Sequence, residues 1–167
     1  ADLTGATLTN VVISATTNLT SAKLINADLS SANLSAADLT SIEMAKADLT
    51  GANLASTTLT SANLAGAKLG GANLTGADLT GGAKLSKVDL TGADLTSADL
   101  TGADLTGAKL NNATLTGTNI SGANLTAVDL TGATGLTTGL TGPMGIIISA
   151  TTNLTSAKLV GADLTGD

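Results

Sequence analysis

Residues 93–107 read Ala-Asp-Leu-Thr-Ser, Ala-Asp-Leu-Thr-Gly and Ala-Asp-Leu-Thr-Gly, so a five-residue unit occurs three times in succession. The unit can be followed outward from there, with a central residue every fifth position from Leu19 to Leu79 and from Leu85 to Leu130 that is Leu except at Met44 and Ile120. Ala usually lies two residues before the centre and Asp or Asn one residue before it, while Thr or Ser and often Gly follow it. A fixed short period of this kind predicts a repeat architecture.

A period of five fits neither an amphipathic helix nor a simple alternating strand. Frequent Gly also opposes a continuous helix. The period suits a chain that turns a corner once per unit, with the central Leu pointing inward and the small Ala fitting where the interior is tight. The polar residue before Leu then points outward, and the Thr-Gly or Thr-Ser pair supplies a turn. Because each unit buries little apolar surface alone, stability must come from stacking coils on coils.

These units resemble the pentapeptide repeat family, whose motif A(D/N)LXX is matched at Ala27-Asp28-Leu29, Ala52-Asn53-Leu54 and Ala93-Asp94-Leu95. The resemblance covers roughly residues 1–132 and 153–165. It implies an all-β fold, a right-handed quadrilateral β-helix with four units per coil. We therefore expect one solenoid over residues 1–167, with about eight coils at the ordinary spacing of hydrogen-bonded strands. Its core is expected to be a Leu ladder that includes Leu29, Leu49, Leu69, Leu90, Leu110 and Leu130.

Three places break the five-residue period. One extra residue lies between Ile13 and Leu19, and another lies at Gly81-Gly82. The third break is longer, and residues 133–148, which include the only Pro, are predicted to form an irregular loop or bulge. This segment ends in the apolar run Ile146, Ile147 and Ile148. The run is either a buried β segment that returns to the solenoid or an exposed strip that forms a lateral interface with another subunit.

A longer repetition links the two ends of the sequence. Residues 13–24 and residues 148–159 are identical over twelve positions, at an offset of 135 residues. We therefore expect residues 146–167 to begin a second copy of a superrepeat. The first and last units are ordinary repeats without a capping helix, and an uncapped coil exposes unpaired backbone groups. The sequence thus predicts end-to-end contacts through Leu3, Leu8, Leu159 and Leu164.

The composition excludes most enzyme chemistry. Cys, His and Arg are absent, which leaves no thiolate or imidazole metal ligand and no Cys–His or Ser–His nucleophile system. The Asp residues before the centres are expected to lie apart on a solvated surface, so we predict no enzymatic activity, no cofactor, no metal and no small-molecule substrate. The net charge of −6 opposes direct binding to nucleic acid, and the longest apolar stretch is far shorter than a membrane span.

Two functions from different classes remain. The first is a structural β-solenoid rod, a subunit or segment of an extracellular or cell-surface filament, whose partner is itself in a head-to-tail homopolymer or as tandem copies in a longer chain. The second follows from the resemblance, because some pentapeptide repeat proteins are acidic rods that imitate DNA and bind DNA gyrase. Against the second, we expect Lys residues such as Lys68 to interrupt the acidic faces. Ice binding needs adjoining Thr columns, and the Thr-Leu-Thr triplets at residues 7–9, 58–60 and 114–116 are too scattered to form them.

Overall fold

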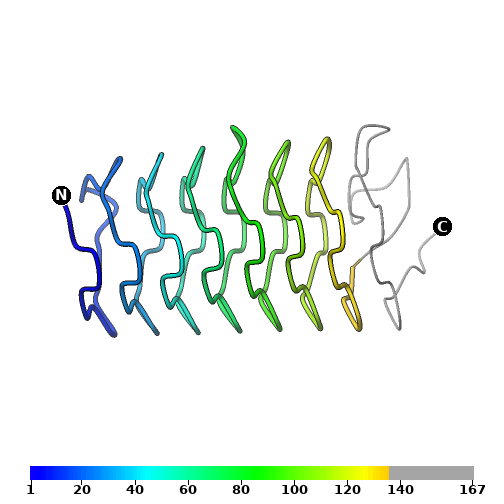
Figure 1. Ribbon diagram of the computed structural model, residues 1–167, viewed down its shortest axis with the longest axis horizontal. Helices are drawn as coiled ribbons and strands as arrows, with labels where there is room; N and C mark the ends of the chain where they lie inside the picture. Colours follow the sequence, from blue (N-terminus) through cyan, green and yellow to red (C-terminus); the bar gives the residue numbers. More distant parts are fainter. Residues whose placement is uncertain (136–167) are drawn as a thin grey trace.

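The computed structural model describes residues 1–135, which form a rod of stacked coils (Figure 1). This part of the chain contains no helix and no continuous strand. Each unit instead contributes one residue, the residue before the central Leu, to parallel bridges with the neighbouring coils. Most bridges join residues that are 20 apart, for example Asp28 and Asp48, so that four five-residue units complete one turn of the rod.

The bridged residues form four columns, and each column marks one face of the rod. Face 1 carries Asp2, Lys23, Glu43, Asn63, Lys84, Asp104 and Asn124. Face 2 carries Thr7, Asp28, Asp48, Lys68, Asp89, Lys109 and Asp129. Face 3 carries Val12, Asn33, Asn53, Asn73, Asp94, Thr114 and Thr134. Face 4 carries Asn18, Asp38, Thr58, Asp78, Asp99 and Asn119. Because the faces follow one another around each coil, face 4 adjoins face 1.

A tight turn connects each face to the next. The amide N–H of Ala27 donates to the carbonyl of Leu24 at 3.0 Å and closes a turn around Ile25 and Asn26. Asn26 has a φ of 56°, which lies in the left-handed region. A turn with a positive φ at its third position favours Gly or Asn there, and this explains why Gly recurs two residues after so many centres.

Every amide of a typical unit has a hydrogen-bond partner, as residues 47–51 show. Ala47 N–H donates within the corner to Met44 O, and Asp48 N–H donates back to Ala27 O in the preceding coil. The amides of Leu49 and Gly51 donate forward to carbonyls of the next coil. The remaining amide, that of Thr50, donates to the Asp48 side chain. Buried or half-buried amides require partners, so the unit satisfies its backbone through its neighbours and one of its own side chains.

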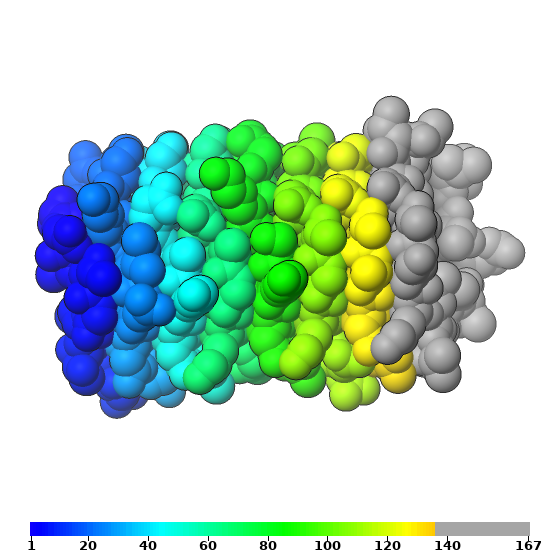
Figure 2. Space-filling view, in the orientation of Figure 1, coloured from blue at the N-terminus to red at the C-terminus, as the bar shows by residue number. Residues whose placement is uncertain are grey.

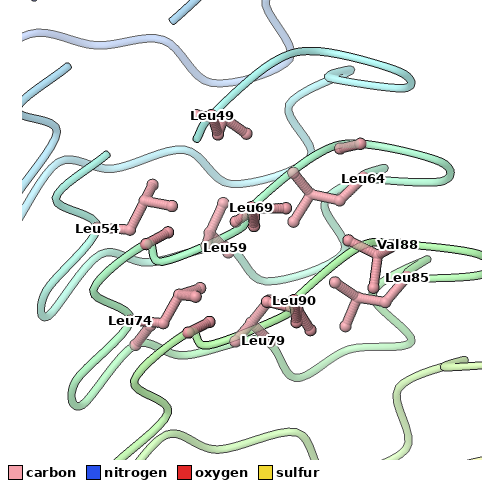
Figure 3. Close-up of a cluster of buried hydrophobic side chains, with 14 of the residues drawn as sticks. Leu49, Leu54, Leu59, Leu64, Leu69, Leu74, Leu79, Leu85, Val88 and Leu90 are labelled. Atoms are coloured by element: carbon pink, nitrogen blue, oxygen red, sulfur yellow. The ribbon is translucent and has the colours of Figure 1, made fainter. Parts of the chain in front are cut away.

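The core is a column of Leu side chains lined by Ala. Figure 3 shows part of it, where Leu side chains from successive coils stack toward the rod axis. The six residues expected to form one ladder are each at most 3% exposed: Leu29, Leu49, Leu69, Leu90, Leu110 and Leu130. The Ala residues two positions before the centres are also buried, for example Ala52 and Ala93. Because each buried Leu contributes about 2 kcal/mol, stability accumulates with the number of stacked units.

Within residues 1–135, two buried polar side chains replace Ala in the core. Thr57 and Thr118 are each at most 1% exposed. Their hydroxyl groups donate to the carbonyls of Leu54 and Leu95, both at 2.7 Å. No buried side-chain nitrogen or oxygen of residues 1–135 lacks a hydrogen-bond partner. The core therefore tolerates an occasional Thr because a carbonyl is within reach.

Each extra residue is absorbed in a single corner. Beside Gly81-Gly82 the bridge offset rises from 20 to 21, as between Asn63 and Lys84, and it returns to 20 between Lys84 and Asp104. The bridge offset changes in the same way at the first extra residue, near residues 15–16. It is 21 between Val12 and Asn33 and 20 between Asn18 and Asp38. The centres on both sides of Gly81-Gly82, Leu79 and Leu85, stay buried, whereas Ile13 and Leu19 beside the first insertion are only partly buried. The successive coils remain in contact along the rod (Figure 2).

Candidate interaction surfaces

The sequence-predicted contact residues fall into two groups. Leu3 and Leu8 lie in the first coil, where they are only partly buried against the core, together with Val11, Ile13 and Leu19. Within the described residues, this coil makes bridges on one side only. The predicted contacts at Ile146, Ile147, Ile148, Leu159 and Leu164 lie outside the described residues, as does the predicted second superrepeat.

All six lysines of residues 1–135 lie on one side of the rod. Lys23 and Lys84 belong to face 1, and Lys68 and Lys109 belong to face 2. Lys46 and Lys87 are the left-handed residues of the corner between these two faces. Lys68 and Lys109 lie 3.2 Å and 3.6 Å from the carboxylates of Asp48 and Asp89. No salt bridge within residues 1–135 involves the other four: Lys23, Lys46, Lys84 and Lys87.

Faces 3 and 4 of residues 1–135 carry no positive charge. Their bridged columns contain four acids, Asp38, Asp78, Asp94 and Asp99, and otherwise Asn, Thr and Val12. The expectation that Lys interrupts the acidic faces is therefore correct for faces 1 and 2 and wrong for faces 3 and 4. The reason is geometric, because the 20-residue turn places every described Lys on two adjacent faces.

Faces 3 and 4 are also covered by short side chains. One unbroken column on face 4 contains Thr20, Thr40, Thr60, Thr80 and Thr101, the residues that directly follow the central Leu, and Ser121 continues it. This column is more regular than the scattered Thr-Leu-Thr triplets suggested. The hydroxyl groups of Thr40 and Thr101 are engaged, however, since they donate to Asp38 and Asp99 beside them. These two positions thus present fixed carboxylates rather than free threonine hydroxyls.

Hydrogen bonds to threonine stabilise the charged form of these carboxylates. The hydroxyl of Thr40, and then its amide N–H, lower the pKa of Asp38 below its ordinary value. On face 2 the Thr91 hydroxyl lowers the pKa of Asp89 in the same way, although burial acts in the opposite direction. A hydrogen bond donated to a carboxylate favours ionisation, so both groups are fully charged at neutral pH.

The family model for pentapeptide repeats matches the chain in eight copies, at residues 17–51, 42–81, 82–112 and 99–132. These matches cover well over half of the sequence. The chain belongs to the pentapeptide repeat family. Family membership indicates a right-handed β-helix solenoid, in agreement with the parallel bridges between successive coils.

Solved pentapeptide repeat proteins resemble this chain over most of its length. HetL, involved in heterocyst differentiation regulation in the cyanobacterium Nostoc sp. strain PCC 7120, is 32% identical over 98% of this chain and 84% of its own, with a TM-score of 0.36. A pentapeptide repeat protein of the Arabidopsis thaliana thylakoid lumen is 32% identical over 72% of this chain and 68% of its own, with a TM-score of 0.34.

A third structure, QnrB1, is a plasmid-mediated fluoroquinolone resistance protein. It is 17% identical over 96% of this chain and 89% of its own, with a TM-score of 0.45. The comparison with curated protein sequences found no significant match to the chain.

Two features are absent from the described part of this pentapeptide repeat protein, a cluster of metal-ligating side chains and a membrane-spanning helix. Within residues 1–135, no three carboxylates come together in a group that could hold a metal ion. The same residues contain no helix that is long and apolar enough to cross a membrane. The candidate functional features are the side of the rod that carries the described lysines, the side that carries none, and the coil edge at residues 1–20.

Proposed function

We propose that this protein is a structural rod that joins head to tail, either to identical subunits or to further superrepeat copies within a longer chain. The observation that carries the proposal is the coil of residues 1–20, which makes bridges only toward the next coil and leaves Leu3 and Leu8 partly exposed. A row of unpaired strand groups is a template for another chain. The twelve-residue identity between residues 13–24 and 148–159 supports a copy of the same chain as the occupant.

The proposed contact continues the hydrogen-bond pattern that already joins the coils. In an inner unit the residue before Leu donates its amide N–H to the preceding coil, as Asp48 does to Ala27. Within the described residues, Val12 holds the equivalent position and its amide makes no such bond. Val12 is also 73% exposed, the most exposed large apolar side chain of residues 1–135. A further coil placed on this edge would use the Val12 amide and cover the partly exposed Leu side chains.

The test is electron microscopy and light scattering of the 167-residue chain at high concentration, with Val12→Pro as the blocking variant. Proline removes the free amide without removing a bond of the described fold, and Val12→Thr is the matched control because it keeps that amide. We expect long rods from the parent and from Val12→Thr, and short particles from Val12→Pro. A monodisperse particle of 16.0 kDa from the parent chain at every concentration would contradict the proposal.

Localisation belongs to the same proposal, since a fibre of this kind would act outside the cell or at its surface. The chain contains no Cys, so its folding depends on no redox state and is compatible with that location. Immunogold labelling of intact source cells tests this part separately from assembly. Label confined to the cell interior would refute the location and leave the assembly proposal intact.

A second candidate is an acidic protein-binding module of the DNA-mimic kind. The absence of lysine from faces 3 and 4 of residues 1–135 favours it, because two adjoining faces then present four Asp residues without an intervening positive charge. Binding of purified DNA gyrase to the immobilised chain tests this candidate. Saturable binding that weakens in a combined Asp38→Asn, Asp78→Asn and Asp99→Asn variant would support it, and the absence of binding would exclude gyrase as the partner.

A further inference from the structure

The two sides of the rod differ in both charge and side-chain length. Outward-pointing residues of faces 3 and 4, and of the corners that follow them, are Asn, Asp, Thr, Ser, Ala or Gly throughout residues 1–135, except Val12. All six described lysines and Glu43 lie on faces 1 and 2 or the corner between them. Face 4 carries short side chains and three Asp residues, so another molecule can approach it closely. Face 1 also carries acids, namely Asp2, Glu43 and Asp104, but face 1 and its lysine corner extend four long cationic side chains that make no salt bridge within residues 1–135.

The acidic groups on face 4 are held in place before any partner arrives. Asp38 and Asp99 each accept the amide and hydroxyl of the Thr two residues later through one oxygen, Oδ1. The second oxygen of each carboxylate makes no hydrogen bond within the described residues and is available to a cation. Asp78 is fixed similarly by Thr80 and also accepts the hydroxyl of Thr60 at 3.1 Å. Pre-organised groups lose little freedom on binding, which favours association.

We propose that two copies of this chain associate side by side and antiparallel, with face 1 and its lysine corner on one rod against face 4 of the other. The bridges number the coils, because each turn takes 20 or 21 residues. Counting turns from residue 1, the unpaired lysines occupy the second (Lys23), third (Lys46) and fifth coils (Lys84 and Lys87). The acids of face 4 occupy the second (Asp38), fourth (Asp78) and fifth coils (Asp99).

Reversing one rod brings these two series into register. When the second coil of one rod lies beside the fifth coil of the other, Lys23 faces Asp99 and Lys46 faces Asp78. Glu43 shares the third coil with Lys46, and its carboxylate accepts a hydrogen bond from Asn63 on its own face at 2.7 Å. The lysines of the fifth coil, Lys84 and Lys87, then face Asp38. A parallel arrangement without a shift leaves Lys46 opposite Thr58 and Asp78 opposite Asn63 or Gly66. Of these two arrangements, only the antiparallel one places a lysine opposite every Asp of face 4. This lateral contact is independent of the end-to-end contact proposed above.

Zero-length carbodiimide cross-linking tests the register directly. An equal mixture of isotope-labelled and unlabelled chain distinguishes links between copies from links within one copy. We expect mixed-isotope links between Lys46 and Asp78, between Lys23 and Asp99, and between Lys87 and Asp38. Mixed links between Lys23 and Asp38 would instead indicate parallel rods and overturn the proposed orientation, and the absence of any mixed link between face 1 and face 4 would overturn the contact itself.

Variants that remove charge but keep the fold test the energetics. Asn already occupies the ends of the face 4 column, where Asn18 and Asn119 accept the same amide bond as Asp. A combined Asp38→Asn, Asp78→Asn and Asp99→Asn variant should therefore fold normally and lose the ion pairs. We expect its lateral association constant to fall about tenfold at low ionic strength, and the association of the parent chain to weaken as salt is added.

The sign of this effect separates a specific contact from general electrostatics. A chain of net charge −6 should associate more readily when acids are removed if net charge alone controls association. The proposed contact predicts the opposite for face 4. Asp28→Asn on face 2 is the matched control, and it should leave lateral association unchanged or strengthen it. Stronger association of the face 4 variant, or equal weakening by the control, would overturn the proposal.

Discussion

The amide N–H and the hydroxyl of Thr96 both donate to one oxygen, Oδ1 of Asp94, at 2.9 Å and 2.6 Å. The same arrangement joins Asp48 to Thr50 and Asp104 to Thr106. It gives the Asp-Leu-Thr part of the repeat a structural purpose, because the amide after Leu has no partner in a neighbouring coil. The main structural role of the acidic residue is therefore to accept a backbone hydrogen bond, and its surface charge accompanies that role.

Loss of this acceptor should destabilise the rod. We expect Asp94→Ala to lower the free energy of unfolding by about 1 kcal/mol, because the Thr96 amide and hydroxyl lose their partner. Asp94→Asn keeps an oxygen acceptor and should change stability much less. Urea denaturation monitored by far-ultraviolet circular dichroism measures both variants. Equal losses in the two variants would mean that charge, and not the hydrogen bonds, is the important property of Asp94.

A charge placed in the Leu ladder should disrupt the solenoid. Leu95 is fully buried, so Leu95→Asp would place an unpaired carboxylate in the core and cost several kcal/mol. Leu95→Ala leaves only a cavity and should cost about 2–5 kcal/mol. Thermal melting compares the two, and Ser97→Ala at an exposed corner is a control. A nearly unchanged melting temperature for Leu95→Asp would contradict the inward position of this side chain.

The corner with the extra residue should tolerate substitution less well than an ordinary corner. Gly81 and Gly92 both have left-handed backbones, with φ of 67° and 69°. A Cβ at Gly92 meets nothing within 4 Å, so Gly92→Ala should cost only the backbone strain of about 1 kcal/mol. A Cβ at Gly81 would lie 2.8 Å from side-chain atoms of both Thr60 and Ser61.

Those two side chains are held by hydrogen bonds, Ser61 to the carbonyl of Gly81 itself and Thr60 to Asp78. They cannot move without losing a partner, so Gly81→Ala should cost about 1 kcal/mol more than Gly92→Ala. Chemical denaturation of both variants under the same conditions gives the difference. If the two losses were equal, the packing at this corner would be looser than the contacts indicate.

Acidification should weaken the fold. Hydrogen bonds from Thr40 and Thr91 lower the folded-state pKa of Asp38 and Asp89 below the ordinary value of 3.8. Between the unfolded and folded pKa values the unfolded chain binds more protons, so stability falls as pH falls. The stabilisation is therefore complete above the ordinary pKa and disappears as pH drops through the lower, folded pKa.

Urea denaturation at a series of pH values from neutral to about 2 measures this dependence. A combined Asp38→Asn and Asp89→Asn variant should show a shallower decline, since neither position can then be protonated. A parent chain whose stability rises on acidification would contradict the sign, and would indicate that repulsion among the carboxylates exceeds the effect of their hydrogen bonds.

Much of the fold could be predicted from the five-residue period because local chemistry repeats in every unit. The inward Leu, the small Ala and the corner residue are each determined by their own neighbours, so residues such as Leu69 could be placed from the pattern alone. The partnership between Asp94 and Thr96 was missed, although its signal is present in the sequence as Thr or Ser regularly following Asp-Leu. Such a pair suggests a side chain bonded to its own backbone, a common role of Asp in turns.

The sequence by itself determined that the chain turns every five residues and buries one Leu per turn, because a period of five permits no regular helix or strand. Only the tertiary structure decided which units lie above one another, since each extra residue could have shifted every later column. Absorption of the extra residue at Gly81-Gly82 within one corner keeps Asp78 below Asp99 on face 4 and Lys68 below Asp89 on face 2. The confinement of the described lysines to faces 1 and 2 and the corner between them depends on this alignment. Backbone hydrogen bonds between coils impose it, and no single unit encodes it.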